Sequence, residues 1–195
     1  MRRFDREIID PVIINAMMKE FDTLYLGLID GDYPYVVPVN FGYMMKDDQL
    51  LLYIHTSKQG HKIDLIHKSQ NVSVTFSRFN DFPDKKYKMH YHDYRSVMAK
   101  GHIHLIEPDK DFNKYKQAFE LLYTCNHREV KPLDKEHLPP MNIYEIVCDM
   151  KDVTAKSEFP LRTIEDVPFM DIYSQEDDQT PFDISDIIAE RKRQG

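Results

Sequence analysis

Tryptophan is absent from this chain of 195 residues, and cysteine occurs only twice, at Cys125 and Cys148. The cysteines form no C-x-x-C pair, which excludes a disulfide scaffold and favours a reduced, cytoplasmic protein. The sequence opens without an apolar leader, and no apolar run approaches the roughly 20 residues that a membrane-spanning helix needs. We therefore expect a soluble protein that does not associate with membranes.

Positive charge is also scarce, because 26 Lys and Arg stand against 33 Asp and Glu, for a net charge of -7. This balance argues against a nucleic-acid surface and against binding to anionic membranes, although it leaves room for a local basic pocket. The hydrophobic fraction of 42% is enough for one core of ordinary size.

The first half of the chain predicts one helix followed by strands. Asp10 and Pro11 suit the cap and first residue of a helix with an apolar face that runs to Phe21. The segment TLYLGLIDGDYPYVVPVNFGY predicts two strands joined at Asp-Gly-Asp, and QLLLYIH predicts a third. Pro34 and Pro38 lack the N–H that a central strand donates, so the second strand is either an edge or a place where backbone faces a ligand.

The second half predicts more strands and two further helices. A short helix is expected to begin near His61, and NVSVTFS predicts a half-buried strand before a loop at 80–93. The segment DKDFNKYKQAFELLYTC predicts a helix, and NIYEIVCDMKDVTA predicts the last strand. YRSVMAKGHIHLIE alternates, which predicts Val97, Ala99, Gly101, Ile103 and Leu105 inside and Ser96, Met98, Lys100, His102 and His104 outside.

At least six strands, mostly joined by hairpins, favour a small barrel over a doubly wound sheet. The predicted fold class is therefore mainly β, a barrel with flanking helices. From Lys156 the composition becomes acidic and irregular, and only DISDIIAERKR resembles a helix. We expect a barrel domain at 1–157 and a C-terminal extension at 158–195 that ends in a short helix.

A cluster of cations marks the start of the short helix near His61. Lys58, His61 and Lys62 lie within five residues, together with the flexible Gly60. Cations normally favour the other end of a helix, because the N-terminus already carries partial positive charge from its unpaired N–H groups. The cluster therefore predicts either a phosphate cradle or a solvated basic turn, and spacing alone leaves both open.

Three motifs carry a resemblance to a known family. DGDYPYVVPVNFGY, LLYIHTSKQGHKIDLI and YRSVMAKGHIHLIE occur in an order that resembles the flavin-binding split-barrel proteins related to pyridoxamine-phosphate oxidase, and most of all their 5-nitroimidazole reductase (Nim) branch. The resemblance runs from about Arg2 to about Ser157. It implies a homodimer of six-stranded split barrels that binds FMN at the subunit interface.

The resemblance also implies a set of cofactor-binding residues. The FMN phosphate maps onto the turn with the cation cluster, the ring lies along the backbone of the VVPVNF strand, and other residues reach the cofactor from neighbouring strands. His55 is the candidate proton donor. Each residue also has an ordinary structural interpretation; Arg95, for example, could simply pair with Asp93. The implied cofactor-binding set is Pro38, Val39, Asn40, His55, Thr56, Lys58, Gly60, His61, Lys62, Arg95 and Ser96.

Two other constellations compete with a flavin site. His90 with His92 and His102 with His104 are i, i+2 pairs that project from one face of a strand, as metal or haem ligands do. A polar strand face explains them more simply, and we predict no metal site. Cys125 lies two residues before His127, but a structural cysteine at a helix end explains it more simply than a nucleophile.

The resemblance implies an FMN-dependent oxidoreductase, in which NADH or NADPH supplies electrons and a small acceptor, such as a nitroaromatic 5-nitroimidazole, takes them. A non-catalytic flavin- or haem-binding carrier or sensor is the alternative, and a domain with an empty pocket that acts through its tail is a third. None of these functions requires nucleic acid or a membrane.

Overall fold

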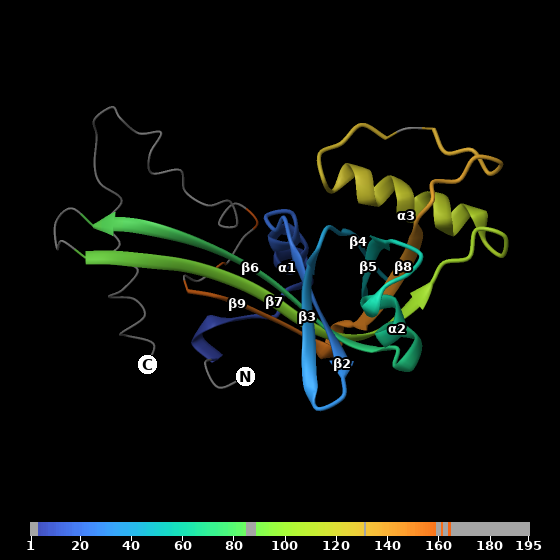
Figure 1. Ribbon diagram of the computed structural model, residues 1–195. Coiled ribbons are helices and arrows are strands. Elements are labelled where there is room, and N and C mark those ends of the chain that lie inside the picture. The colour runs from blue at the N-terminus through green and yellow to red at the C-terminus, as the bar shows by residue number, and fades with distance from the viewer. Residues whose placement is uncertain (1–3, 85–88, 131, 159–160, 162–163, 165–195) are drawn as a thin grey trace. The chain divides into compact units, whose positions relative to one another are not determined.

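The computed structural model describes the backbone of residues 4–84, 89–130, 132–158, 161 and 164, and the side chains of these residues except at 4, 80–84 and 89–92. The predicted terminal helix at 183–193 lies outside the described residues, as does almost all of the predicted extension. The described elements, in chain order, are the 3-10 helix η1 (Phe4–Arg6), β1 (Glu7–Ile8), α1 (Pro11–Met18), β2 (Leu24–Asp30), β3 (Tyr33–Val39), β4 (Gly42–Lys46), β5 (Gln49–Thr56), α2 (His61–Lys68), β6 (Asn71–Asp84), β7 (Met89–Leu105), α3 (Phe112–Thr124), β8 (Asn142–Asp149), the 3-10 helix η2 (Met150–Asp152) and β9 (Val153–Ser157) (Figure 1).

The chain divides into two compact units. Phe21–Ser77 and Val97–Thr154 form the second unit, and the other described residues belong to the first. The strands of the second unit follow the order β3-β2-β6-β7-β8-β5-β4, and the registers of β2–β3, β2–β6, β4–β5, β5–β8 and β7–β8 are antiparallel. This sheet confirms the predicted mainly β fold class.

The interior of the second unit is built by strand alternation. Successive side chains of a strand point to opposite faces, so every second residue turns inward. The inward residues are almost fully buried and include Leu24, Leu26, Leu28, Leu50, Leu52, Ile54, Val72, Val74, Phe76, Val97, Ala99, Ile103, Ile146 and Cys148.

The sheet face opposite these buried residues is the outer face. Helix α3 covers part of it, beside β4, β5 and β8 (Figure 1). Asp111 caps its N-terminus by accepting the N–H of Lys114 at 2.9 Å. Its apolar face joins the outward residues of the strands below in one cluster. The buried members are Tyr53, Ile106, Tyr115, Ala118, Phe119, Leu122 and Ile143.

The first unit contains α1 and the short β1–β9 pair. Asp10 caps α1 by accepting the Val12 N–H at 2.8 Å, as predicted, but the helix ends at Met18 instead of continuing to Phe21. A salt bridge between Arg6 and Glu158, with an N–O distance of 2.6 Å, joins η1 to the residue that follows β9. The two ends of the described chain are therefore tied within this unit.

Two predictions about the long strands are wrong. Residues 80–93 do not form a loop throughout, because β6 continues to Asp84 and β7 begins at Met89; the mixed aromatic and polar composition hid the strands. Leu105 is 44% exposed and Ser96 is buried, against the predicted alternation. Leu105 is the last residue of β7, and the outward residue that follows it, Ile106, is the buried one, because it lies in the cluster under α3 and its N–H donates to the Ile143 carbonyl.

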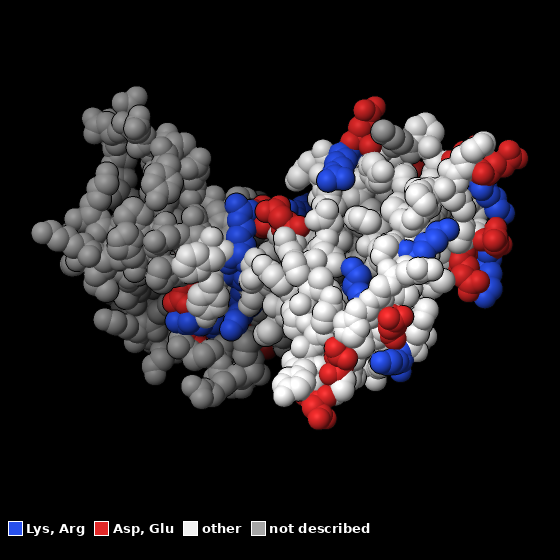
Figure 2. All heavy atoms as spheres, in the orientation of Figure 1, with Lys and Arg blue, Asp and Glu red and all other residues white. Residues whose placement is uncertain are grey.

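Charge is mixed on the surface of the described residues. On the face shown in Figure 2, Lys and Arg side chains are interspersed with Asp and Glu and form no extended basic surface. Among the described residues, no helix is both long enough and apolar enough to cross a membrane.

Candidate functional site

The turn before α2 has the geometry of an uncapped helix N-terminus. Gly60 has φ +129, a conformation that side chains disfavour, and it provides no side-chain cap for the first N–H groups of α2. A Cβ at Gly60 would meet nothing within 4 Å, so the space beside this turn is open. The N-terminus of α2 is thus available to an anion.

His61 is held by the β2–β3 hairpin. Its Nε2 lies 2.8 Å from Oδ2 of Asp30, and its ring meets the Tyr35 ring edge-on at 5.2 Å between centroids. Asp30 was missed by the sequence reasoning, which treated it only as a turn residue. Because Nε2 is engaged, only Nδ1 of His61 remains for another partner.

The charge of Lys62, at the start of α2, acts on His55 near the end of β5. Burial lowers the pKa of His55 from its ordinary value of 6.5, and the positive charges of Lys62 and Arg128 lower it further. Burial also lowers the pKa of Lys62. Among the described residues, no carboxylate forms an ion pair with Lys58, Lys62 or Arg128. Lys58, Lys62 and Arg128 therefore have no ion-pair partner in the described part of the chain, whereas the neighbouring His61 pairs with Asp30.

The open edge of β3 offers few hydrogen-bond donors. Pro38 pairs with Tyr25 and Pro34 with Ile29, and a proline cannot donate to a ladder, so these must be the non-hydrogen-bonded pairs. By alternation the Val36 N–H also points to the open edge, whereas the Val39 N–H points to β2. The edge donors are therefore Val36 and, one step beyond the strand, Asn40. Val36 is a residue that the sequence reasoning missed.

The β4–β5 register brings Asn40 toward His55. Gly42 pairs with Tyr53, so the two preceding residues, Asn40 and Phe41, continue toward His55 and Ile54. Thr56 is 4% exposed, and its hydroxyl donates to the Ser57 carbonyl at 2.8 Å. The predicted residues of β3, β5 and the α2 turn thus all belong to the second unit. Those of β3 and β5 lie at or next to the C-terminal ends of these strands.

Arg95 and Ser96 belong to the first unit, unlike the other predicted residues. Arg95 is 4% exposed and donates to Asp93 at 2.9 Å, which is the structural interpretation that the sequence left open. A role of these two residues toward a cofactor stays a prediction.

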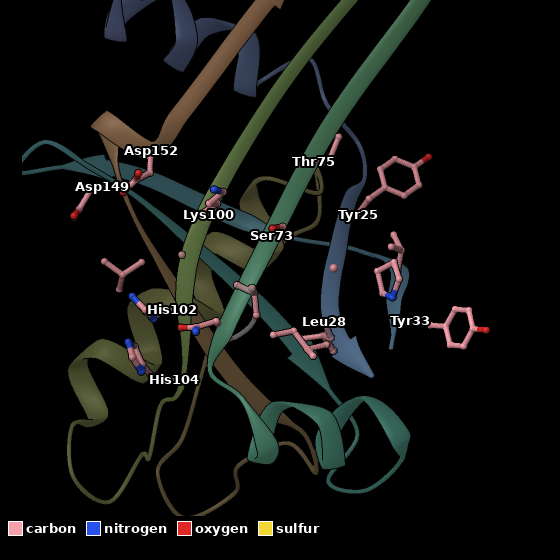
Figure 3. A pocket seen from close by; sticks show the side chains of 18 of the residues that line it. Tyr25, Leu28, Tyr33, Ser73, Thr75, Lys100, His102, His104, Asp149 and Asp152 are labelled. Atoms are coloured by element: carbon pink, nitrogen blue, oxygen red, sulfur yellow. The ribbon is translucent and has the colours of Figure 1, made fainter. Parts of the chain in front are cut away.

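A hollow of about 1120 Å³ lies on the outer sheet face that α3 leaves uncovered. His102 and His104 project into it from β7, and Tyr25 and Tyr33 lie on its opposite side (Figure 3). The described side chains bring together no group of three His, Cys, Asp or Glu that could hold a metal. The side chains of His90 and His92 lie outside the described residues.

Comparison with known proteins identifies the family. Residues 14–156 match the family model described as pyridoxamine 5'-phosphate oxidase. Because this match spans most of the sequence, the chain belongs to the pyridoxamine 5'-phosphate oxidase family. Among curated proteins, none matches the chain.

Solved structures share the fold. A proposed 5-nitroimidazole antibiotic resistance protein from Bacteroides thetaiotaomicron is 24% identical, with a TM-score of 0.64 over 77% of this chain and 86% of that one. The FAD and heme binding protein from Mycobacterium smegmatis is 13% identical, with a TM-score of 0.60 over 93% and 97%. An FAD-binding protein from Mesorhizobium loti is 17% identical, with a TM-score of 0.54 over 78% and 96%. At these identities the likeness is one of fold.

Proposed function

We propose that the protein is an FMN-dependent oxidoreductase that takes electrons from NADH or NADPH and passes them to a small acceptor. Its family supports flavin chemistry. The observation that carries the proposal is the uncapped N-terminus of α2, where Lys58 and Lys62 have no carboxylate partner among the described residues. A dianionic phosphate matches this site in charge and in hydrogen-bonding capacity.

The residues present fit FMN at two places. The α2 turn would hold the phosphate through Lys58, Lys62, Nδ1 of His61 and the first helix N–H groups. At the open β3 edge, the N–H groups of Val36 and Asn40 would donate to the polar edge of the ring. Pro38 and Val39 would contact the ring through their side chains, and Pro38 also offers its carbonyl. Bound flavin would supply the capacity to accept a hydride and release electrons.

His55 is the proposed site of proton exchange with the acceptor. Its lowered pKa keeps the imidazole neutral at pH 7 in the described chain, so it can hold a proton on one ring nitrogen and accept one on the other. Thr56, with its buried hydroxyl, would fix the end of β5 on which His55 is carried. Arg95 and Ser96 are proposed to contact the cofactor from β7.

The remaining assignments of the proposal concern the substrate, the assembly and the compartment. We assign a nitroaromatic acceptor such as a 5-nitroimidazole because of the likeness to the Bacteroides protein. We also propose a homodimer that completes each FMN site at the interface. Cys125 and Cys148 are free thiols, in agreement with a reducing cytoplasm.

Purified protein tests the proposal directly. The preparation is expected to be yellow, to bleach without oxygen when NADH or NADPH is added, and to regain colour when a 5-nitroimidazole is supplied. Tight flavin retention without bleaching would instead identify a carrier or sensor. A Soret band would identify a haem protein, and a colourless protein that fails to take up added FMN would overturn the flavin assignment.

A further inference from the structure

The C-terminal end of α3 packs very closely against β4 of the sheet. A Cβ at Gly42 would lie 2.6 Å from the backbone carbon of Leu121 and 2.7 Å from the nitrogen of Leu122. Only glycine permits backbone to approach backbone at this distance. The position of the α3 end is therefore set by contact with the first residue of β4.

The turn that follows α3 is fixed by three further interactions. The Asn126 amide donates to the Phe41 carbonyl at 2.9 Å and to the Leu122 carbonyl at 2.7 Å. His127 adopts the left-handed conformation, with φ +54, and the Arg128 N–H donates to the Tyr123 carbonyl at 3.0 Å. The backbone of Arg128 is thus held in place by hydrogen bonds and does not hang from a free loop.

This turn lies next to the end of β5. Phe41 and Gly42 run alongside Ile54 and Tyr53 in the β4–β5 register, and His55 follows directly. The backbone of Arg128, two residues after the Asn126 that is bonded to Phe41, is thereby held near the end of β5 that carries His55. The lowered pKa of His55 agrees with this placement, since the charge of Arg128 is one of its causes.

The charges of Arg128 and Lys62 thus act on His55 from two different elements, and each cation has no carboxylate partner among the described residues. Two positive charges that act on one imidazole disfavour its protonation, and an oxyanion beside His55 would compensate both charges and accept hydrogen bonds from both side chains. We propose that Arg128 and Lys62 clamp one oxyanion beside His55, with the C-terminal turn of α3 as the fixed arm of the clamp. Only the source of the oxyanion rests on the proposed function: it is the phosphate of the cofactor or a carboxylate of the acceptor.

Calorimetric titration of the full chain with inorganic phosphate at low ionic strength tests the clamp. Arg128→Gln is expected to weaken phosphate binding about tenfold, because one charge-assisted contact is lost. Arg128→Lys should retain part of the affinity, since it keeps the charge but not the planar fork. Lys116→Gln, an exposed position of α3, is the matched control and should bind as the wild type does. Thermal unfolding verifies that each variant is folded.

The same variants identify the source of the oxyanion. If Arg128→Gln weakens binding of FMN but not of riboflavin, the clamp holds the cofactor phosphate. If both flavins bind normally while acetate and phosphate bind more weakly, it holds the acceptor. A protein that binds phosphate through Arg128 but takes up no flavin would refute the proposed function and leave the clamp standing. Phosphate binding by Arg128→Gln that equals the wild type would overturn the clamp.

Discussion

The cations at the two ends of α3 differ in whether they have a carboxylate partner. Near its N-terminal end, Lys114 donates to Oε2 of Glu145 at 2.6 Å, and Glu145 is 5% exposed. The Tyr53 hydroxyl lies 3.4 Å from Oε1 of the same carboxylate, and burial and this carboxylate raise the pKa of Tyr53. Beyond the C-terminal end, the charge of Arg128 acts on His55 together with that of Lys62, and neither cation pairs with a carboxylate among the described residues.

This difference suggests a structural role for the Lys114–Glu145 pair and a binding role for Arg128 and Lys62. A buried carboxylate is costly unless a cation and hydrogen bonds compensate it, and Glu145 has both. The cations whose charge acts on His55 have no such partner among the described residues, and the proposed oxyanion would compensate them. We therefore expect substitutions at the N-terminal end to change folding stability and substitutions beyond the C-terminal end to change binding.

Breaking the seat of α3 should give the largest effect. Gly42→Ala forces a Cβ against the backbone of Leu121 and Leu122, and we expect a loss of about 3 kcal/mol in the free energy of unfolding, together with weaker FMN binding as the Arg128 turn moves. Urea denaturation measures the stability. Gly27→Ala is the matched control, because its Cβ would meet the Ser73 carbonyl at 3.4 Å, and it should cost less than about 0.5 kcal/mol. Equal losses in both variants would refute the close seat.

Removing the cation at Lys62 should affect binding alone. Lys62→Ala is expected to weaken FMN binding by about 1 to 3 kcal/mol, because a charge-assisted contact to the phosphate is lost. Its free energy of unfolding without ligand should not fall, since burial already disfavours the charge of Lys62 and no described carboxylate pairs with it. Fluorescence titration with FMN, with riboflavin as the ligand control, measures the first effect. Unchanged FMN affinity would count against Lys62 as a phosphate ligand.

The opposite result is expected at the other end of α3. Lys114→Met keeps most of the aliphatic stem but leaves the Glu145 carboxylate without its cation, and it should cost about 1 kcal/mol of stability because Lys114 is itself 41% exposed. FMN affinity should be unchanged. Lys110→Met, which breaks the exposed pair with Glu107, is the control and should cost less than about 0.5 kcal/mol. In a Glu145→Gln background the loss should largely disappear, and persistence of the full loss would show that packing, not charge, is the cause.

Much of the fold could be predicted because it follows from local patterns. Strand alternation predicted the buried faces around Val74 and Val97, and the Asp10-Pro11 pair predicted the start of α1. The loop predicted at 80–93 was wrong, because long strands need partners that sequence periodicity alone does not reveal.

The candidate site was predictable only where its residues are close in sequence. Lys58, His61 and Lys62 share one turn, so their charge was visible in the sequence. Arg128 lies far along the chain, and its charge acts on His55 because Gly42 and Asn126 fix the end of α3 near β5; no spacing rule predicts such an arrangement. The pairing of His61 with Asp30 depends likewise on the docking of α2 against the hairpin.

The smallest expected effect is a pH dependence that arises from His55. Burial, Lys62 and Arg128 lower its pKa in the folded chain below the ordinary 6.5, so below pH 6.5 the unfolded chain binds a proton that the folded chain does not yet accept. The stabilising contribution is thus present above pH 6.5 and is lost as the pH falls through the folded pKa. The decrease in the urea midpoint of unfolding from pH 7 to pH 5 should therefore be larger in the wild type than in His55→Gln. Bound FMN should lessen the fall, because phosphate charge near His55 favours its protonated form; an equal pH response of the wild type and His55→Gln would place His55 away from the two cations.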